Sequence, residues 1–182
     1  DYDEDEKKKM MSIRSALGFV EIDGVKINII DTPGTADFIG EARAAIQVAE
    51  AVVLVVDSVD GVQIETEKAW RYLAERGIPR IIFVNKMDKE RASYQKVMDN
   101  LKSAFKANIA PLSVPAGEGE KFNGIIDILQ MKLQTSKPGA KDVTVGEVPA
   151  DMKAKAEEER NKLIEVAAEA DDALIEKFLE GG

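Results

Sequence analysis

The sequence predicts an α/β domain built on a doubly wound sheet, and three features support this class. Residues 51–57 and 80–84 are continuous apolar runs of strand length, which is the pattern of parallel strands buried on both faces. Helical patterns at residues 66–76 and 93–105 alternate with these strands. Alternation of this kind is typical of doubly wound sheets, which bind ligands beyond the carboxyl ends of their strands.

The elements before residue 51 fit the same class. Residues 1–9 are dense in charge, and we expect them to be solvated. Residues 16–22 and 25–30 are rich in β-formers and flank an Asp-Gly pair, which predicts a hairpin. Its second strand ends at a Pro-Gly pair, and a helix follows for which Asp37 is a candidate N-cap.

The character of the chain changes after about residue 106. Short strands are expected within residues 109–114 and 124–129, and residues 135–148 are polar and indicate an irregular arm. Two helices are expected at the end, over residues 151–170 and 171–179. We therefore predict two parts, a main α/β part at 1–106 and an appended α+β subdomain at 107–182.

Composition excludes several classes of protein. The chain has 182 residues, with 25 Lys+Arg against 34 Asp+Glu and a formal net charge of −9, so it has no general attraction for free DNA. It has no cysteine and no histidine, which excludes disulfides, imidazole–zinc sites and histidine-dependent triads within this chain. No apolar run approaches the ~20 residues of a membrane span. We expect a soluble, cytoplasmic protein with no membrane partner.

The tetrapeptide Asn85-Lys86-Met87-Asp88 follows a predicted buried strand and fits guanine recognition. Guanine presents two adjacent N–H donors, and one carboxylate accepts both in a strong, charge-assisted arrangement. Asp88 would have this role, Asn85 would hold the base edge, and the aliphatic stem of Lys86 would lie across the base. The same letters also fit a simple polar turn. An adenine-nucleotide enzyme is disfavoured, because adenine has an acceptor where guanine has the N1–H.

A second tetrapeptide, at residues 31–34, fits the binding of phosphate and metal. An aspartate at a strand end can hold Mg²⁺, usually through water, and a glycine lets its backbone N–H approach a phosphate. The alternative is a strand-terminating turn. Because the two tetrapeptides are separated by helix, strand, helix and strand, we expect both at the same sheet edge. The predicted nucleotide-binding residues are Asp31, Thr32, Pro33, Gly34, Asn85, Lys86 and Asp88.

With these motifs in place, residues 3–182 resemble the translational GTPases of the elongation factor G family. The resemblance implies a P-loop-NTPase-like sheet, incomplete here, with an inserted α+β subdomain, GTP/GDP and Mg²⁺ as ligands, and GTPase activity in the full-length protein. It also implies a role in translation with the ribosome as partner, through the large-subunit stalk and the factor-binding region. The stretches that carry the resemblance are Met10-Met11-Ser12-Ile13, Glu41-Ala42-Arg43, Asp57-Ser58, Gly61-Val62-Gln63 and Phe122-Asn123-Gly124-Ile125-Ile126-Asp127.

Four positions carry the catalytic and metal roles that the resemblance implies. Ser12 falls on a threonine that binds Mg²⁺ in the family and keeps a hydroxyl group, so Ser12 and Asp31 are the candidate metal ligands. Family members have a histidine after the Pro-Gly pair, which positions the attacking water. Thr35 occupies that position beside Gly34, and this departure resembles the divergent elongation factor G-like branch.

A second departure concerns the phosphate-binding loop. The pattern G-x-x-x-x-G-K-[ST] does not occur in the sequence, and in the family it precedes the first switch region, so we expect it before Asp1. On this interpretation the chain is a piece of a longer protein and is inactive by itself. An alternative function is a non-hydrolysing module that binds GTP, or only a ribosomal partner, which Thr35 favours.

Overall fold

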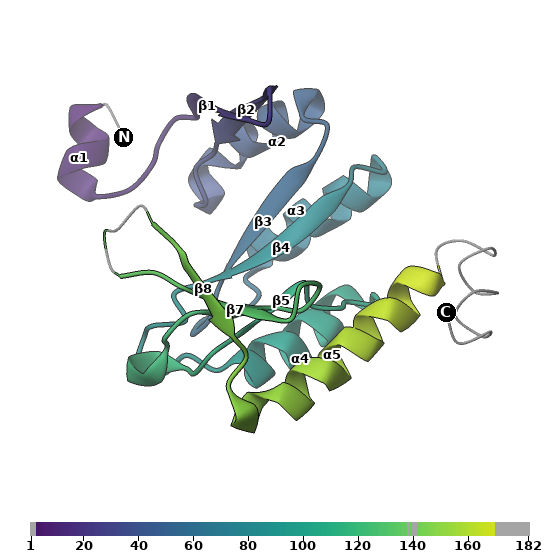
Figure 1. Cartoon of the computed structure of the whole chain (residues 1–182). Helices are drawn as coiled ribbons and strands as arrows, with labels where there is room; N and C mark the ends of the chain where they lie inside the picture. Colours follow the sequence, from purple (N-terminus) through teal and green to yellow (C-terminus); the bar gives the residue numbers. More distant parts are fainter. Residues whose placement is uncertain (1–2, 138, 140–141, 170–182) are drawn as a thin grey trace. The chain divides into compact units, whose positions relative to one another are not determined.

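The computed structural model describes residues 3–137, 139 and 142–169, and these residues form a mixed α/β fold (Figure 1). The chain divides into two compact units. Unit 1 comprises Asp1–Val55 and Gln63–Phe83, and unit 2 comprises Val56–Val62 and the chain from Val84 onward. The mixed α/β class is confirmed, although each of the sheets is small. The division of the sequence at residues 106 and 107 stays a prediction.

The predicted hairpin is confirmed in unit 1, where β1 (Ala16–Ile22) pairs antiparallel with β2 (Val25–Asp31). The turn residues Asp23 and Gly24 have φ values of 50° and 79°, the left-handed conformation that two-residue hairpin turns require. One face of this ribbon is apolar and exposed. It is formed by Val20, Ile22, Val25, Ile27 and Ile29, whose exposed fractions lie between 39% and 61%.

The strand–helix–strand unit is also confirmed, as β3 (Val52–Asp57), α3 (Ile64–Glu75) and β4 (Arg80–Asn85). The amide of Val52 donates to the Pro79 carbonyl at one end of the pair. The amide of Ser58 donates to the Asn85 carbonyl at the other end, so the two strands run parallel.

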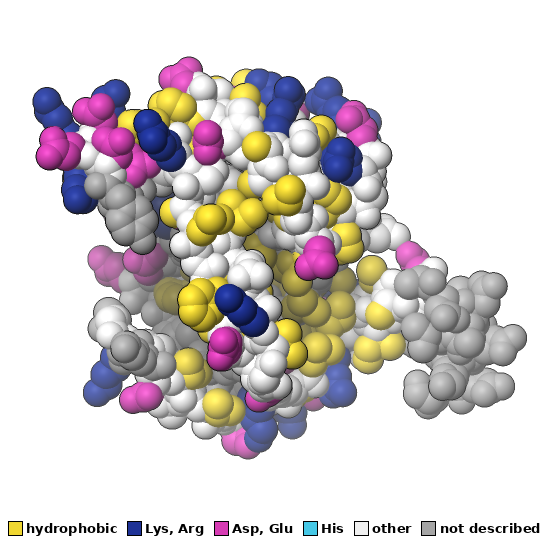
Figure 2. Space-filling view, turned by 90° about the horizontal axis from the view of Figure 1, so that it is seen from above, with side chains coloured by type: hydrophobic (Ala, Val, Ile, Leu, Met, Phe, Trp, Pro, Cys, Tyr) yellow, Lys and Arg dark blue, Asp and Glu magenta, His cyan; other side chains and the backbone are white. Residues whose placement is uncertain are grey.

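The expected burial of these strands on both faces is wrong. Four apolar side chains of these strands remain more than half exposed, and Figure 2 shows hydrophobic side chains at the surface of the molecule. A continuous apolar run fits a strand covered on one face as well as a strand covered on two, and periodicity does not distinguish them. The four are Val53, Val55, Ile81 and Phe83.

The charged N-terminal segment is not merely solvated chain, because α1 (Glu4–Lys9) forms there. Asp3 and Glu6 make a capping box at its start, and acidic residues fill its first turn and lysines its last. The capping box satisfies backbone amides that lack a partner within the helix, and the placement of the charged residues matches the helix dipole. The helix has one buried residue, Glu6, with 4% exposure.

The helix after β2 is confirmed as α2 (Ile39–Val48), preceded by the short 3₁₀ turn η1 (Ala36–Phe38). Asp37 is not its N-cap. Thr35 is the N-cap of the 3₁₀ turn and Phe38 is the N-cap of α2, with no side-chain cap hydrogen bond at either position. The intervening turn moves the start of the α-helix beyond the reach of Asp37.

Unit 2 combines helices with a four-stranded antiparallel sheet in the order β5–β6–β7–β8. The strands expected near residues 113 and 125 are confirmed, but the arm expected at 135–148 contains strand as well as loop. The shorter helix expected at 171–179 lies outside the described residues. The elements are α4 (Tyr94–Phe105), β5 (Ser113–Pro115), η2 (Gly119–Lys121), β6 (Ile125–Asp127), β7 (Lys132–Thr135), β8 (Thr144–Glu147) and α5 (Ala150–Ala168).

The core of unit 2 comes from α4 and the strands of its sheet. Leu101 of α4 is 1% exposed, and Ile126 and Ile128 are fully buried. Among the helices that the structure describes, none is both long enough and apolar enough to cross a membrane.

Leu101→Ala is expected to lower the free energy of unfolding by about 2–5 kcal/mol, because it leaves a cavity in this core. Leu129, at 61% exposure, provides the matched control. Leu129→Ala should change the unfolding free energy by no more than about 0.5 kcal/mol. Urea unfolding followed by circular dichroism measures both, and equal losses would contradict this description of the core.

Candidate functional site

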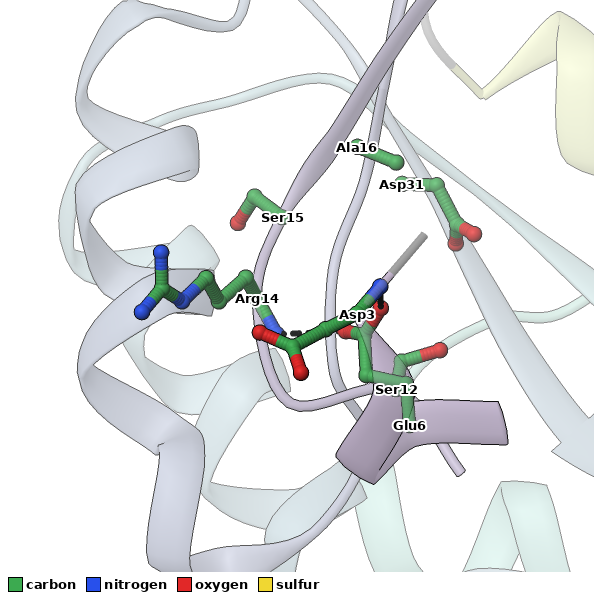
Figure 3. A pocket seen from close by; sticks show the side chains of 7 residues that line it. All are labelled: Asp3, Glu6, Ser12, Arg14, Ser15, Ala16 and Asp31. Atoms are coloured by element: carbon green, nitrogen blue, oxygen red, sulfur yellow. Dashed lines mark hydrogen bonds between the residues drawn. The ribbon is translucent and has the colours of Figure 1, made fainter. Parts of the chain in front are cut away.

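A pocket of about 330 Å³ in unit 1 brings together the two candidate metal ligands (Figure 3). Ser12 comes from the segment between α1 and β1, and Asp31 is the last residue of β2. The pocket is lined by Asp3, Glu6, Ser12, Arg14, Ser15, Ala16 and Asp31. The hairpin register brings the two segments together, because Ala16 at the start of β1 pairs with Asp31 at the end of β2.

The groups in this pocket fit a magnesium ion. A serine hydroxyl and a carboxylate are hard oxygen donors, and Mg²⁺ is usually held by one or two protein groups while it keeps several waters. The pocket is large enough for an ion with such waters. The described residues contain no group of three or more acidic, cysteine or histidine side chains arranged to hold a metal. Ser12 and Asp31 could hold such an ion, with water completing its coordination.

The segment after β2, residues 32–35, has no charged side chain, and its backbone is accessible at Gly34. Pro33 is buried and fixes the turn, whereas Gly34 and Thr35 are exposed and Thr32 is half-buried. No atom lies within 4 Å of the position that a Cβ of Gly34 would occupy, so the approach to its backbone is open. The Thr35 carbonyl accepts a hydrogen bond from the Phe38 amide at 3.1 Å. This geometry can accommodate an anion close to the main chain.

In unit 2, hydrogen bonds to its backbone carbonyl groups hold the Asn85–Asp88 loop in place. The Ser58 amide donates to the Asn85 carbonyl at 2.9 Å, and the Ser58 hydroxyl donates to the Lys86 carbonyl at 2.7 Å. The Gly119 amide donates to the Met87 carbonyl at 2.9 Å, and Met87 is buried. The loop is therefore fixed from two sides.

The side chains that the sequence predicts to read a base are those this loop exposes. Asn85, Lys86 and Asp88 are all exposed, in contrast to the buried Met87 between them. The Asn85 side-chain oxygen accepts a hydrogen bond from the Lys86 amide at 2.8 Å. Lys86 has a φ of 62°, a left-handed conformation that is uncommon outside glycine and is frequent at functional turns.

Lys86 is tied to the end of β3 by an ion pair. Its Nζ lies 2.6 Å from Oδ2 of Asp57, and the other oxygen of Asp57 accepts the amides of Val59 and Asp60. The hydrogen bond from Lys86 is the main cause that lowers the pKa of Asp57, and the Val59 amide adds to it. The same pairing raises the pKa of Lys86. Asp57 thus both caps its own loop and anchors the lysine.

Sequence reasoning did not assign the residues that hold the Asn85–Asp88 loop. Ser58 directly follows a strand, which is a weak signal by itself. Gly119 has a φ of 59°, and a Cβ there would lie 3.3 Å from the Lys89 carbonyl, so this position favours glycine. Its partner in the loop is distant in sequence, and no local pattern reveals the contact. The shared sheet edge expected for residues 31–34 and 85–88 stays a prediction, since the two segments belong to different units.

Comparison with known proteins then identifies the family. Residues 1–180 match the family described as Elongation factor Tu GTP binding domain. The chain belongs to this family. Its fold is also similar to a crystal structure of a protein from Thermus thermophilus, with a TM-score of 0.89 and 31% sequence identity. The similarity covers 100% of this chain and 27% of that one, so the chain spans about a quarter of the protein that it resembles.

Membership of the elongation factor Tu GTP-binding domain family indicates the ligand class of the chain. By its description the domain binds GTP. The chemistry of the two segments agrees with that description. Residues 31–34 offer oxygen ligands and open backbone, and the Asn85–Asp88 loop offers amide, ammonium and carboxylate groups. The translational GTPase class of G domain is thereby confirmed at the level of the family.

Lys86→Met is expected to raise the pKa of Asp57 toward its ordinary value of about 3.9. The increase should be partial, because the amides of Val59 and Asp60 still donate to the carboxylate. The lowered pKa means that charged Asp57 stabilises the fold above pH ~3.9, and this contribution is lost as the pH falls through the lowered pKa.

Carbon-detected NMR titration of the Asp57 carboxyl measures this change. Lys89→Met is the matched control, since it removes an exposed lysine from the same loop region and should leave the pKa of Asp57 unchanged. An Asp57 pKa that is the same in wild type and Lys86→Met would show that the ion pair does not persist in solution.

Proposed function

We propose that the full-length protein binds GTP and GDP with Mg²⁺ and hydrolyses GTP as a ribosome-associated translation factor of the elongation factor G-like branch. The observation that carries this proposal is the fixed Asn85–Asp88 loop, which exposes three polar side chains in a chain of the GTP-binding domain family. Backbone bonds of this kind hold the exposed side chains in place before a ligand arrives, which lowers the entropic cost of binding a base.

Each residue has a distinct role in this proposal. Asp88 accepts the N1–H and N2–H groups of guanine, and Asn85 holds the base edge. The stem of Lys86 lies across the base while its ammonium group stays on Asp57. In unit 1, the open backbone at Gly34 is proposed to take part in phosphate binding. These contacts orient the nucleotide and select guanine over adenine.

Ser12 and Asp31 would hold the magnesium ion, with Asp31 acting through water. When bound, the ion would neutralise the negative charge that develops on the phosphate oxygens during transfer. The ribosome, through its stalk and factor-binding region, is the proposed partner. The appended part at 107–182 is proposed to be the inserted subdomain of the family. The four-stranded sheet of unit 2 and α5 support its α+β character.

A non-hydrolysing regulatory module is the second candidate, and Thr35 favours it. The threonine is exposed at the start of η1, where its hydroxyl can bind water but cannot act as an imidazole base. Such a module would bind GTP, or only its ribosomal partner, without accelerating hydrolysis.

Asp88→Asn tests the assignment of the base site. The variant should lower the affinity for GDP about a hundredfold or more, because two charge-assisted hydrogen bonds are lost. It should also raise the affinity for xanthosine diphosphate, whose carbonyl can accept from the new amide. Calorimetric titration of the full-length protein measures both.

Asp99→Asn is the matched control, since Asp99 is exposed on α4 and bonds only locally, to Gln95. Its nucleotide affinities should equal those of the wild type. An Asp88→Asn variant that keeps the guanine preference would place the base elsewhere.

The role of Thr35 can be tested by single-turnover GTP hydrolysis with and without ribosomes. Ribosomes should accelerate the wild-type full-length protein, and Thr35→His should increase the stimulated rate further by about a hundredfold, the usual gain from a positioned base. Thr35→Asn, similar in size but without an imidazole, is the control. A wild-type rate that ribosomes cannot raise would favour the non-hydrolysing module instead.

A further inference from the structure

Two carboxylates hold the segment that carries Ser12. Oε1 of Glu6 accepts the amides of Ile13 at 2.8 Å and Arg14 at 3.0 Å. The next amide, that of Ser15, donates to Oε2 of Glu41 at 3.0 Å. Three successive backbone amides therefore point to acidic side chains from two different helices. We call Glu6 and Glu41 the carboxylate clamp.

The clamp also fixes the residue before Ser12. The amide of Met11 donates to the backbone carbonyl of Glu6 at 3.2 Å, so the main chain is bonded to Glu6 on both sides of the serine. Glu6 is 4% exposed, and its other oxygen accepts the Asp3 amide at 3.3 Å. A buried carboxylate needs such donors to replace water, and together they make its position well defined.

Glu41 joins the clamp from α2, which begins shortly after the Asp31–Thr35 segment. The hydrogen bond from the Ser15 amide is the main cause that lowers the pKa of Glu41. The bond links α2 to the segment that precedes β1.

We propose that Glu6 and Glu41 are positioning residues that hold the backbone on both sides of Ser12 at the pocket that Asp31 also lines, and so set the strength of magnesium-dependent GTP binding. Neither carboxylate contacts the nucleotide in this proposal. Both act through the backbone of residues 11–15. The inference rests on the proposed function, because it assumes that Ser12 and Asp31 hold magnesium with the nucleotide.

The test uses Glu6→Gln and Glu41→Gln in the full-length protein, with affinity for a non-hydrolysable GTP analogue measured by calorimetry. With Mg²⁺ present, each variant should bind about tenfold more weakly, as expected for the loss of charge-assisted hydrogen bonds. With EDTA, each should bind as tightly as the wild type to within about twofold. A merely structural weakening would lower both affinities.

Glu4→Gln and Glu50→Gln are the matched controls. Glu4 lies exposed on α1 and Glu50 lies exposed just after α2. Neither should change the affinity under either condition. Glu41 is itself exposed, so Glu41→Gln should fold even where a change at the buried Glu6 does not.

Amide hydrogen exchange without nucleotide tests the clamp directly. Glu6→Gln should speed exchange at Ile13 and Arg14, and Glu41→Gln should speed exchange at Ser15. Faster exchange with an unchanged magnesium dependence would overturn the proposal, as would unchanged exchange in both variants. A wild-type protein that binds no guanine nucleotide would instead overturn the proposed function and this inference together.

Discussion

The loops of this chain depend on polar side chains that end its strands. Asp57, at the end of β3, accepts the amides of Val59 and Asp60, and Asp127, at the end of β6, accepts those of Leu129 and Gln130. Asn85, at the end of β4, accepts the amide of Lys86. Where a strand ends, its following amides lose their ladder partners, and a short carboxylate or amide side chain replaces them. The shape of each loop follows from this replacement.

The same chemistry gives the acidic composition a structural role. Besides those at strand ends, Glu6 and Glu41 accept backbone amides near the pocket, and Glu118 accepts the amide of Tyr94 at the start of α4. Anionic acceptors make stronger hydrogen bonds than neutral ones, so they can hold irregular backbone in a defined form. A net charge of −9 therefore includes several carboxylates that organise the loops rather than bind cations.

Local patterns predicted much of the fold. The Asp23-Gly24 pair defined the hairpin, because few residues tolerate the left-handed turn that it makes. Helix α4 was predicted from periodicity alone, since its buried positions recur at helical spacing. Helix α1 was missed although Asp3 and Glu6 have the spacing of a capping box, because the dense charge concealed that signal. Strand β8 has no buried residue, and only its pairing with β7 defines it.

For the candidate site, the sequence predicts a set of residues, and that set stays a prediction. The motifs at residues 31–34 and 85–88 suggest ligand chemistry through residue type and spacing, but they do not predict the contacts around them. The Asp57–Lys86 pair follows from the register of β3 against β4, and the Gly119 contact follows from the path of a distant loop. Both depend on tertiary structure, so no local sequence pattern contains them.

The central claim is that the exposed side chains of the Asn85–Asp88 loop read guanine while Ser12 and Asp31 hold magnesium. A crystal structure of the full-length protein with Mg²⁺ and a non-hydrolysable GTP analogue tests it most directly. The account predicts both Asp88 oxygens within hydrogen-bonding distance of the N1 and N2 atoms of guanine, with Ser12 and Asp31 around the ion. A base bound away from Asp88, or an ion bound by other side chains, would contradict it.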